Sequence, residues 1–97
     1  MAFSKIGIIG TGVIGEALIE VLLRSGLSKD SLFISEKRGE RRDEIIKKYG
    51  VKELSQRVLL DAILIAVKPQ DFLTTIKELP SSATDSALIV SFAAGIR

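Results

Sequence analysis

The sequence predicts an α/β fold: a doubly wound, mainly parallel sheet of about five strands, with helices on both faces. Two observations predict it. Short apolar, β-branched runs alternate along the chain with segments whose apolar residues recur every three or four positions. Several of the runs contain almost no polar residue, as strands buried on both faces of a parallel sheet require. The alternation continues through the 97 residues, which suffice for one domain.

The first strand is expected at residues 5–10, where an isoleucine-rich run is nearly continuous. The first helix is expected at about residues 13–25, because apolar residues recur there at helical spacing until Ser25 and Gly26 supply a stop signal. A second strand is predicted at residues 32–35. A second helix at 41–48 turns Ile45 and Ile46 inward and ends at Tyr49.

Residues 51–54 form a short third strand in this prediction, and residues 55–60 are either a single helical turn or irregular chain. The clear apolar runs at 62–67 and 87–92 give the fourth and fifth strands. Between them a helix is expected from Pro69 to about Leu79, because proline is tolerated as the first residue of a helix. The connection into the fourth strand must be compact, since parallel crossovers usually need a dozen residues.

Composition narrows the possible functions. The chain has no cysteine and no histidine, which excludes disulfides, thiolate metal sites and a histidine general base. We therefore expect no metal site and assign no catalytic residue. The net charge of +2 does not indicate nucleic-acid binding, and no apolar stretch indicates a membrane span or a signal peptide. A cytoplasmic location is the default expectation.

A glycine motif lies between the first strand and the first helix. Strand, three spaced glycines and helix together make the fingerprint of a dinucleotide-binding, Rossmann-like domain. Gly10 permits the tight turn, Gly12 lets the backbone approach a pyrophosphate, and Gly15 lets the helix pack on the strand. The helix start offers unpaired N–H groups to the phosphates, and the hydroxyl of Thr11 is expected to donate to them as well.

The tip of the second strand indicates which dinucleotide binds. Glu36 lies 21 residues after Gly15, the position at which a carboxylate reads the ribose of NAD. Ser35, Lys37 and Arg38 instead suit the 2′-phosphate of NADP. A phosphate beside Glu36 would be repelled unless that side chain turned outward. The balance favours NADP and leaves NAD possible. The nearby Arg41 and Arg42 are interpreted as part of a solvated helix start.

Two further segments follow strands at the edge where ligands bind in such sheets. The first contains Ala66, Val67, Lys68 and Pro69, and the second Ala93, Ala94 and Gly95. Small residues in the second segment would let the backbone approach a flat nicotinamide ring. Taken singly, each segment is better explained by structure alone: the first as a helix entry, the second as tight packing at the end of a strand.

Together with the glycine loop, these segments resemble the pyrroline-5-carboxylate reductases over nearly the whole chain. The resemblance is carried by Glu-Ala after the loop, Tyr-Gly-Val near the third strand, Ala-Val-Lys-Pro and Ser-x-Ala-Ala-Gly. In this sequence these motifs are residues 16–17, 49–51, 66–69 and 91–95. The chain departs from the family at Val13 and Ile14, where Asn-Met is usual, so that backbone N–H groups would bind the phosphates alone.

The resemblance implies hydride transfer from NADPH or NADH to the C=N bond of 1-pyrroline-5-carboxylate, giving L-proline. It places the glycine loop on the pyrophosphate and Ser35 with its basic neighbours on the adenosine ribose. It also implies roles for both strand-end segments. The nicotinamide ribose would contact Ala66, Val67, Lys68 and Pro69. The nicotinamide would border Ala93, Ala94 and Gly95.

Family members continue into a helical domain that forms a homo-oligomer and contacts the imino-acid substrate. We expect residues 1–97 to be the dinucleotide-binding domain without that second domain, inactive by itself. Two alternatives stay open. One is a related reductase with another acceptor, such as a deazaflavin or a β-hydroxy acid. The other is a stand-alone dinucleotide-binding or redox-sensing module.

Overall fold

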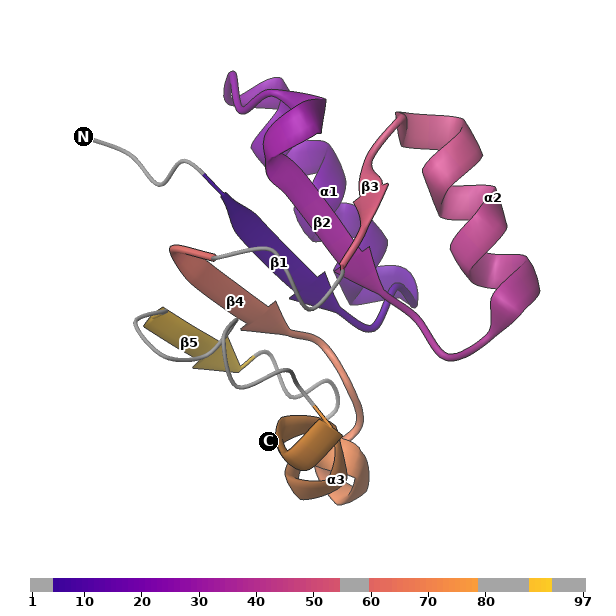
Figure 1. The fold of residues 1–97 in the computed structure, drawn as a ribbon, viewed down its shortest axis with the longest axis vertical. Helices are drawn as coiled ribbons and strands as arrows, with labels where there is room; N and C mark the ends of the chain where they lie inside the picture. The colour runs from indigo at the N-terminus through magenta and orange to yellow at the C-terminus, as the bar shows by residue number, and fades with distance from the viewer. Residues whose placement is uncertain (1–4, 55–59, 79–87, 92–97) are drawn as a thin grey trace.

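The computed structural model describes residues 5–54, 60–78 and 88–91. In this part of the chain every strand pairs in parallel, in the order β3-β2-β1-β4-β5 (Figure 1). The strands are β1 (Ile6–Ile9), β2 (Leu32–Ser35), β3 (Lys52–Glu53), β4 (Ala62–Ile65) and β5 (Leu88–Ser91). The helices are α1 (Val13–Arg24), α2 (Gly39–Tyr49) and α3 (Phe72–Glu78), with 3-10 turns η1 (Lys29–Ser31) and η2 (Pro69–Asp71). The predicted Rossmann-like α/β class is confirmed.

Some boundaries differ from the sequence prediction. Helix α2 begins at Gly39 rather than 41, because the Arg42 N–H already donates to the Arg38 carbonyl at 2.9 Å. The helix expected from Pro69 is a 3-10 turn that leads into α3, and the Asp71 N–H donates to the Lys68 carbonyl. The uncertain segment 55–60 falls mostly outside the described residues, and so does Leu79.

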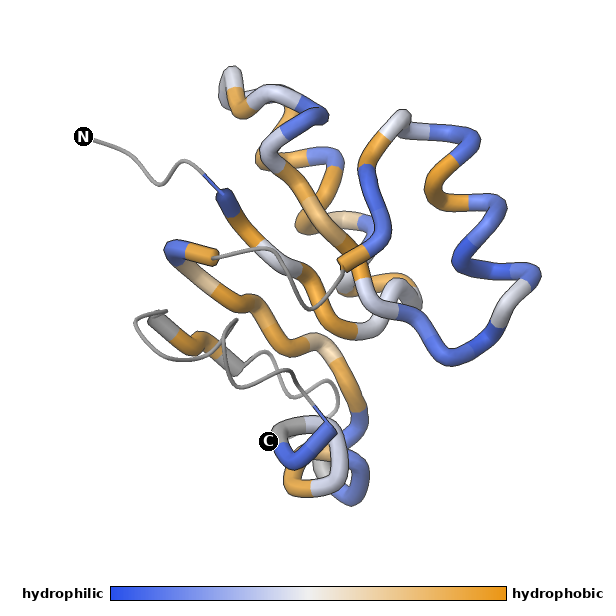
Figure 2. Tube along the Cα trace, viewed as in Figure 1, coloured by the Kyte–Doolittle hydropathy of each residue, from blue (hydrophilic) through white to orange (hydrophobic). Residues whose placement is uncertain are grey.

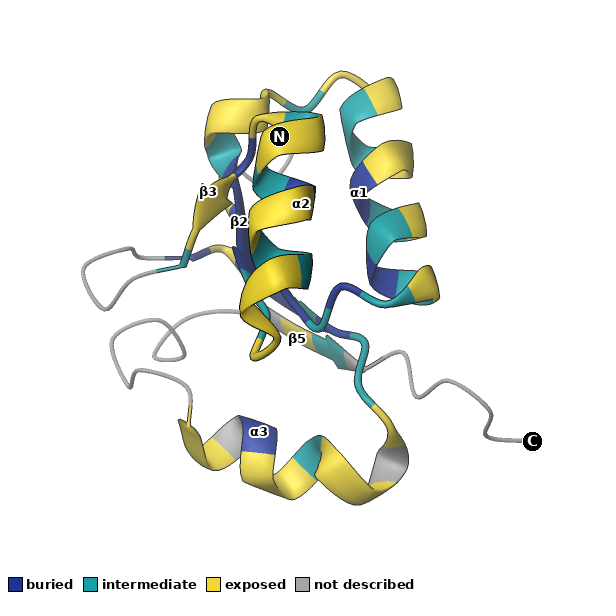
Figure 3. Cartoon of the chain, turned by 90° about the vertical axis from the view of Figure 1, so that its right-hand side faces the viewer, coloured by how far each residue is buried: buried dark blue, intermediate teal, exposed yellow. Residues whose placement is uncertain are grey.

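Alternate residues of β1, β2 and β4 build two hydrophobic layers. On one face of the sheet Ile8, Leu32 and Ile34 are fully buried against Ile19 of α1 and Ile45 of α2. Figure 3 shows these two helices beside each other in one layer, with α3 set apart from them.

The other face of the sheet is also covered. Its buried residues include Phe33, Ile63 and Ile65, and Phe72 at the start of α3 packs against them. The buried strands are correspondingly apolar, whereas α2 is mostly hydrophilic on its outer side (Figure 2). Burial on both faces explains why these strands read as continuous apolar runs in the sequence.

The strand order places β1 in the middle of the sheet. The chain builds outward through β2 and β3 on one side of β1, and through β4 and β5 on the other. The segments that follow β1, β2 and β4 therefore leave the same edge of the sheet around this reversal, the usual position of a ligand site in such folds. In the described parts of the chain, no helix is long and apolar enough to cross a membrane.

Candidate functional site

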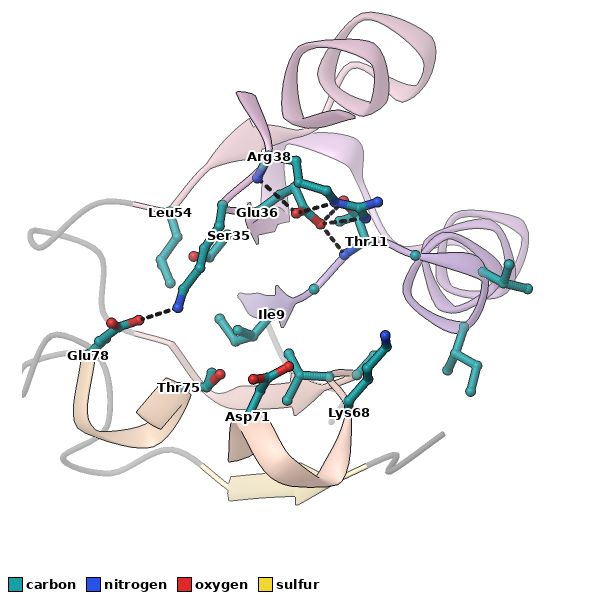
Figure 4. A pocket seen from close by; sticks show the side chains of 17 residues that line it. Ile9, Thr11, Ser35, Glu36, Arg38, Leu54, Lys68, Asp71, Thr75 and Glu78 are labelled. Carbon is teal, nitrogen blue, oxygen red and sulfur yellow. Dashed lines mark hydrogen bonds and ion pairs between the residues drawn. The ribbon is translucent and has the colours of Figure 1, made fainter. Parts of the chain in front are cut away.

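A cleft of about 820 Å³ lies at the carboxyl ends of β1, β2 and β4 (Figure 4). It brings together most of the residues predicted as a site from separate parts of the sequence. Those that line it are Gly10, Thr11, Gly12, Val13, Ile14, Ser35, Glu36, Lys37, Arg38, Ala66, Val67 and Lys68. Gly15 lies behind the lining, the side chain of Pro69 is not described, and Ala93, Ala94 and Gly95 lie outside the described residues.

The three glycines of the loop differ in what surrounds them. Gly10 has a φ of +89°, and a Cβ there would lie 2.7 Å from the Ala66 carbonyl oxygen, where β1 and β4 meet. A Cβ on Gly15 would collide with the Gly10 carbonyl, so the helix can approach the loop only without a side chain at this position. A Cβ on Gly12 would meet no atom within 4 Å. The space above Gly12 therefore opens into the cleft, as the close approach of a pyrophosphate requires.

Thr11 lines the cleft, and its polar groups are bonded to protein partners that hold the loop in place. It is fully buried, and both its N–H and its hydroxyl donate to Oε1 of Glu36 at 2.8 Å. We expected the hydroxyl to donate to phosphates, but its hydrogen is already used by this carboxylate. The short distance between the ends of β1 and β2 explains the difference, since these strands are neighbours in the sheet.

Glu36 turns inward, with only 7% of its side chain exposed. Its Oε2 accepts from the Arg38 N–H and from the Arg38 Nε, each at 3.0 Å. Burial raises the pKa of the Glu36 carboxyl, but the hydrogen bonds from Arg38 and Thr11 outweigh it and lower that pKa to about 2. The carboxylate is therefore charged, and protein donors occupy both of its oxygens (Figure 4).

Arg41 is not part of a solvated helix start, contrary to the sequence interpretation. Its side chain is only 22% exposed, and its Nε donates to the Thr11 carbonyl at 2.7 Å. Its guanidinium also pairs with Glu16 of α1. Arg42 makes longer contacts with Asp43 and Glu53 at the surface, as expected for a helix start.

Glu16 and Tyr49 explain two of the motifs noted in the sequence. The Tyr49 hydroxyl donates to Glu16, and Lys48 Nζ lies 2.8 Å from the same carboxylate. Hydrogen bonds from Lys48, Tyr49 and Arg41 lower the pKa of Glu16 to about 2. Burial, followed by hydrogen bonding to Glu16 and Glu20, raises the pKa of Tyr49. This cluster fastens α1 to α2 directly behind the glycine loop.

Sequence reasoning missed the wall of the cleft opposite the tip of β2. Asp71, Thr75 and Glu78 line that wall, the last two from α3. Their spacing places them on one face of a helical segment, and this polar stripe is a signal that could have been found in the sequence. Ile9 and Leu54 complete the lining. Apolar side chains at strand ends give no distinctive sequence signal.

Comparisons with known proteins agree with this geometry. Residues 5–95 match the family described as NADP oxidoreductase coenzyme F420-dependent. The chain is 33% identical over 102 residues to a pyrroline-5-carboxylate reductase of Mycobacterium tuberculosis (strain H37Rv), covering 96% of the chain and 35% of that protein. It is 31% identical to the enzyme of the same name from Escherichia coli (strain K12), covering 95% and 36%.

Among solved structures, a pyrroline-5-carboxylate reductase from Coxiella burnetii shares the fold, with a TM-score of 0.81 and 23% identity. The match covers 97% of this chain and 37% of that one. The chain thus spans about a third of the length of the relatives it matches. The resemblance inferred from the motifs is confirmed in the names of these homologues. With its glycine loop, its sheet order and a match over residues 5–95, the chain belongs to the family described as NADP oxidoreductase coenzyme F420-dependent.

Proposed function

We propose that this chain is the nicotinamide-dinucleotide-binding domain of a reductase that transfers hydride to the C=N bond of 1-pyrroline-5-carboxylate, giving L-proline. The observation that carries the proposal is the open space above Gly12 in a cleft at the strand-order reversal. The names of the relatives that match nearly the whole chain support the choice of substrate.

The residues of the cleft fit a dinucleotide along its length. Gly12 and the first N–H groups of α1 suit the pyrophosphate, because a helix start carries unpaired donors and a positive dipole end. Ser35, Lys37 and Arg38 suit the adenosine end. Ala66, Val67 and Lys68 suit the nicotinamide ribose. On the resemblance alone, Pro69 is assigned to the same ribose, and Ala93, Ala94 and Gly95 are assigned to the nicotinamide.

A bound dinucleotide would supply the hydride, and this domain would contribute by positioning. In the part of the chain that the structure describes, the cleft is lined by glycine backbone, apolar strand ends and a few charged side chains. These groups can fix an elongated anionic molecule along the edge of the sheet. We infer that the imino acid binds mainly to a further helical domain, through which the protein forms a homo-oligomer.

NADPH is the preferred hydride donor in this proposal, with NADH possible. Glu36 is the residue that would accept hydrogen bonds from the ribose of NAD, yet protein donors already occupy its oxygens. Lys37 and Arg38 are exposed cations beside it, suited to a 2′-phosphate. The family description, which names NADP, supports the same preference.

A deazaflavin acceptor is the second candidate, favoured by the family description, which names coenzyme F420. The two candidates differ in a direct assay. The protein at its natural full length should oxidise NADPH in the presence of 1-pyrroline-5-carboxylate and form proline. Oxidation only in the presence of oxidised coenzyme F420 would establish the second candidate.

The 97-residue chain expressed alone should bind NADPH but form no proline, because it spans about a third of the relatives' length. A titration of NADPH fluorescence measures the binding. Absence of binding would refute the dinucleotide site. Proline formation at the rate of the full-length protein would refute the inference that a further domain holds the substrate. If the full-length protein binds a dinucleotide but reduces neither acceptor, the stand-alone sensing module becomes the better proposal.

A further inference from the structure

One ion pair joins the two walls of the cleft. Nζ of Lys37, in the segment after β2, lies 3.2 Å from Oε1 of Glu78, the last residue of α3. Both residues line the cleft, and Figure 4 shows the Glu78 carboxylate reaching across from α3 toward the tip of β2. Lys37 is also one of the cations that the sequence assigns to the phosphate-bearing end of the ligand.

The two cations at the tip of β2 are held very differently. Arg38 is paired with Glu36, a nearly buried carboxylate of the same segment that also holds the glycine loop. The side chains of Lys37 and Glu78 are 71% and 55% exposed, and such an exposed pair contributes little free energy. Glu78 also lies at the C-terminal end of a helix, where the dipole disfavours a negative charge. The Lys37–Glu78 pair is therefore readily exchanged for a stronger anion.

We propose that Glu78 is a specificity-determining residue, which competes with the 2′-phosphate of the dinucleotide for Lys37. This inference rests on the function proposed above. When a 2′-phosphate arrives, Lys37 leaves Glu78 and pairs with the phosphate, a doubly charged acceptor with several oxygens. NADH has no such group and leaves the Lys37–Glu78 pair intact. Glu78 therefore lowers the affinity for NADPH and affects the affinity for NADH less.

The test compares NADPH and NADH titrations of the full-length protein with those of its Glu78→Gln variant, by fluorescence at low salt. We expect the variant to bind NADPH about two- to five-fold more tightly, the equivalent of one exposed ion pair, with a smaller change for NADH. Asp30→Asn is the matched control. This substitution also removes one negative charge and one exposed ion pair, the pair between Asp30 and Lys52. Asp30 lies in η1, directly before β2, and therefore at the opposite end of the sheet from the cleft. The dissociation constants of this variant should stay at the wild-type values.

A double variant separates direct competition from a general loss of negative charge. In a Lys37→Gln background, Glu78→Gln should no longer change the ratio of NADPH to NADH affinity. Two results would overturn the inference while leaving the dinucleotide site intact. One is that Glu78→Gln raises the NADPH affinity equally with and without Lys37. The other is that Glu78→Gln alone leaves the ratio of NADPH to NADH affinity unchanged. If the wild-type protein bound neither nucleotide, both the inference and the proposed function would be wrong.

Discussion

At the scale of single residues, the missing side chains of Gly12 and Gly15 have different consequences. At Gly15 the space is already filled by the Gly10 carbonyl, so glycine is required by packing. A Cβ on Gly12 would have no protein atom within 4 Å, so the packing of the chain does not require glycine at this position. The same residue type in one motif thus serves stability at one position and ligand approach at the other.

These two positions give a matched pair of variants. Gly15→Ala should lower the free energy of unfolding by about 1–3 kcal/mol or more, because backbone must move to admit the methyl group. Gly12→Ala should cost less than about 1 kcal/mol at this helix start. It should nevertheless weaken NADPH binding by about tenfold or more, the equivalent of about 1.4 kcal/mol.

Urea unfolding measures the stability of both variants, and a fluorescence titration measures NADPH binding by Gly12→Ala. A Gly12→Ala variant that is as stable as the wild type and binds NADPH equally well would contradict the assignment of the pyrophosphate to this position.

At the scale of elements, the glycine loop is held from α2 as well as from its own strand and helix. Arg41, in the first turns of α2, donates to the Thr11 carbonyl and pairs with Glu16 at the start of α1. Glu16 in turn binds Lys48 and Tyr49 at the other end of α2. The loop conformation is therefore a property of three elements packed together.

Arg41→Ala should lower the free energy of unfolding by about 2–3 kcal/mol, because it removes hydrogen bonds to a charged partner and leaves a buried carbonyl unpaired. Arg42→Ala, one residue along the same helix, removes only partly exposed, longer ion pairs and should cost less than about 1 kcal/mol. Thermal or urea unfolding of the two variants measures the difference. Equal losses would mean that the contacts of Arg41 do not hold the loop.

At the scale of the whole molecule, Glu16 and Glu36 each join segments that lie far apart in the sequence. The pKa of each is lowered from an ordinary 4.5 to about 2 by hydrogen bonds that exist only in the folded chain. A carboxyl with a lowered pKa stabilises the folded state fully at pH values above its unfolded pKa. That contribution is lost as the pH falls through the folded pKa.

The protein should therefore lose stability as the pH falls from about 4.5, the ordinary pKa of both carboxyls, to about 2, their pKa in the folded chain. Glu36→Gln should be less stable than the wild type at neutral pH and should show a shallower loss over this interval. Urea unfolding at a series of pH values gives the slope for each protein. If stability falls with pH equally steeply in the wild type and in Glu36→Gln, the Glu36 contacts do not persist in solution.

The sequence by itself determined the class of fold and the edge of the sheet at which the cleft lies. Short apolar runs that alternate with amphipathic helical segments predict a sheet covered on both faces, and three spaced glycines between strand and helix mark one edge of it. These signals are local, so periodicity and glycine spacing suffice to detect them. The sequence placed the segments after β1, β2 and β4 at one edge, because parallel strands end at the same edge, and residues of all three line one cleft.

Only the tertiary structure decided what the polar side chains of the cleft do. Thr11 lies 25 residues from Glu36 and 30 from Arg41 in the sequence, and its hydrogen bonds with them depend on distances set by the packing of β1, β2 and α2. The same holds for Glu78, which faces Lys37 because α3 crosses to the cleft after β4. The sequence does not show whether a charged side chain is solvated or paired, because its partners depend on how the chain folds.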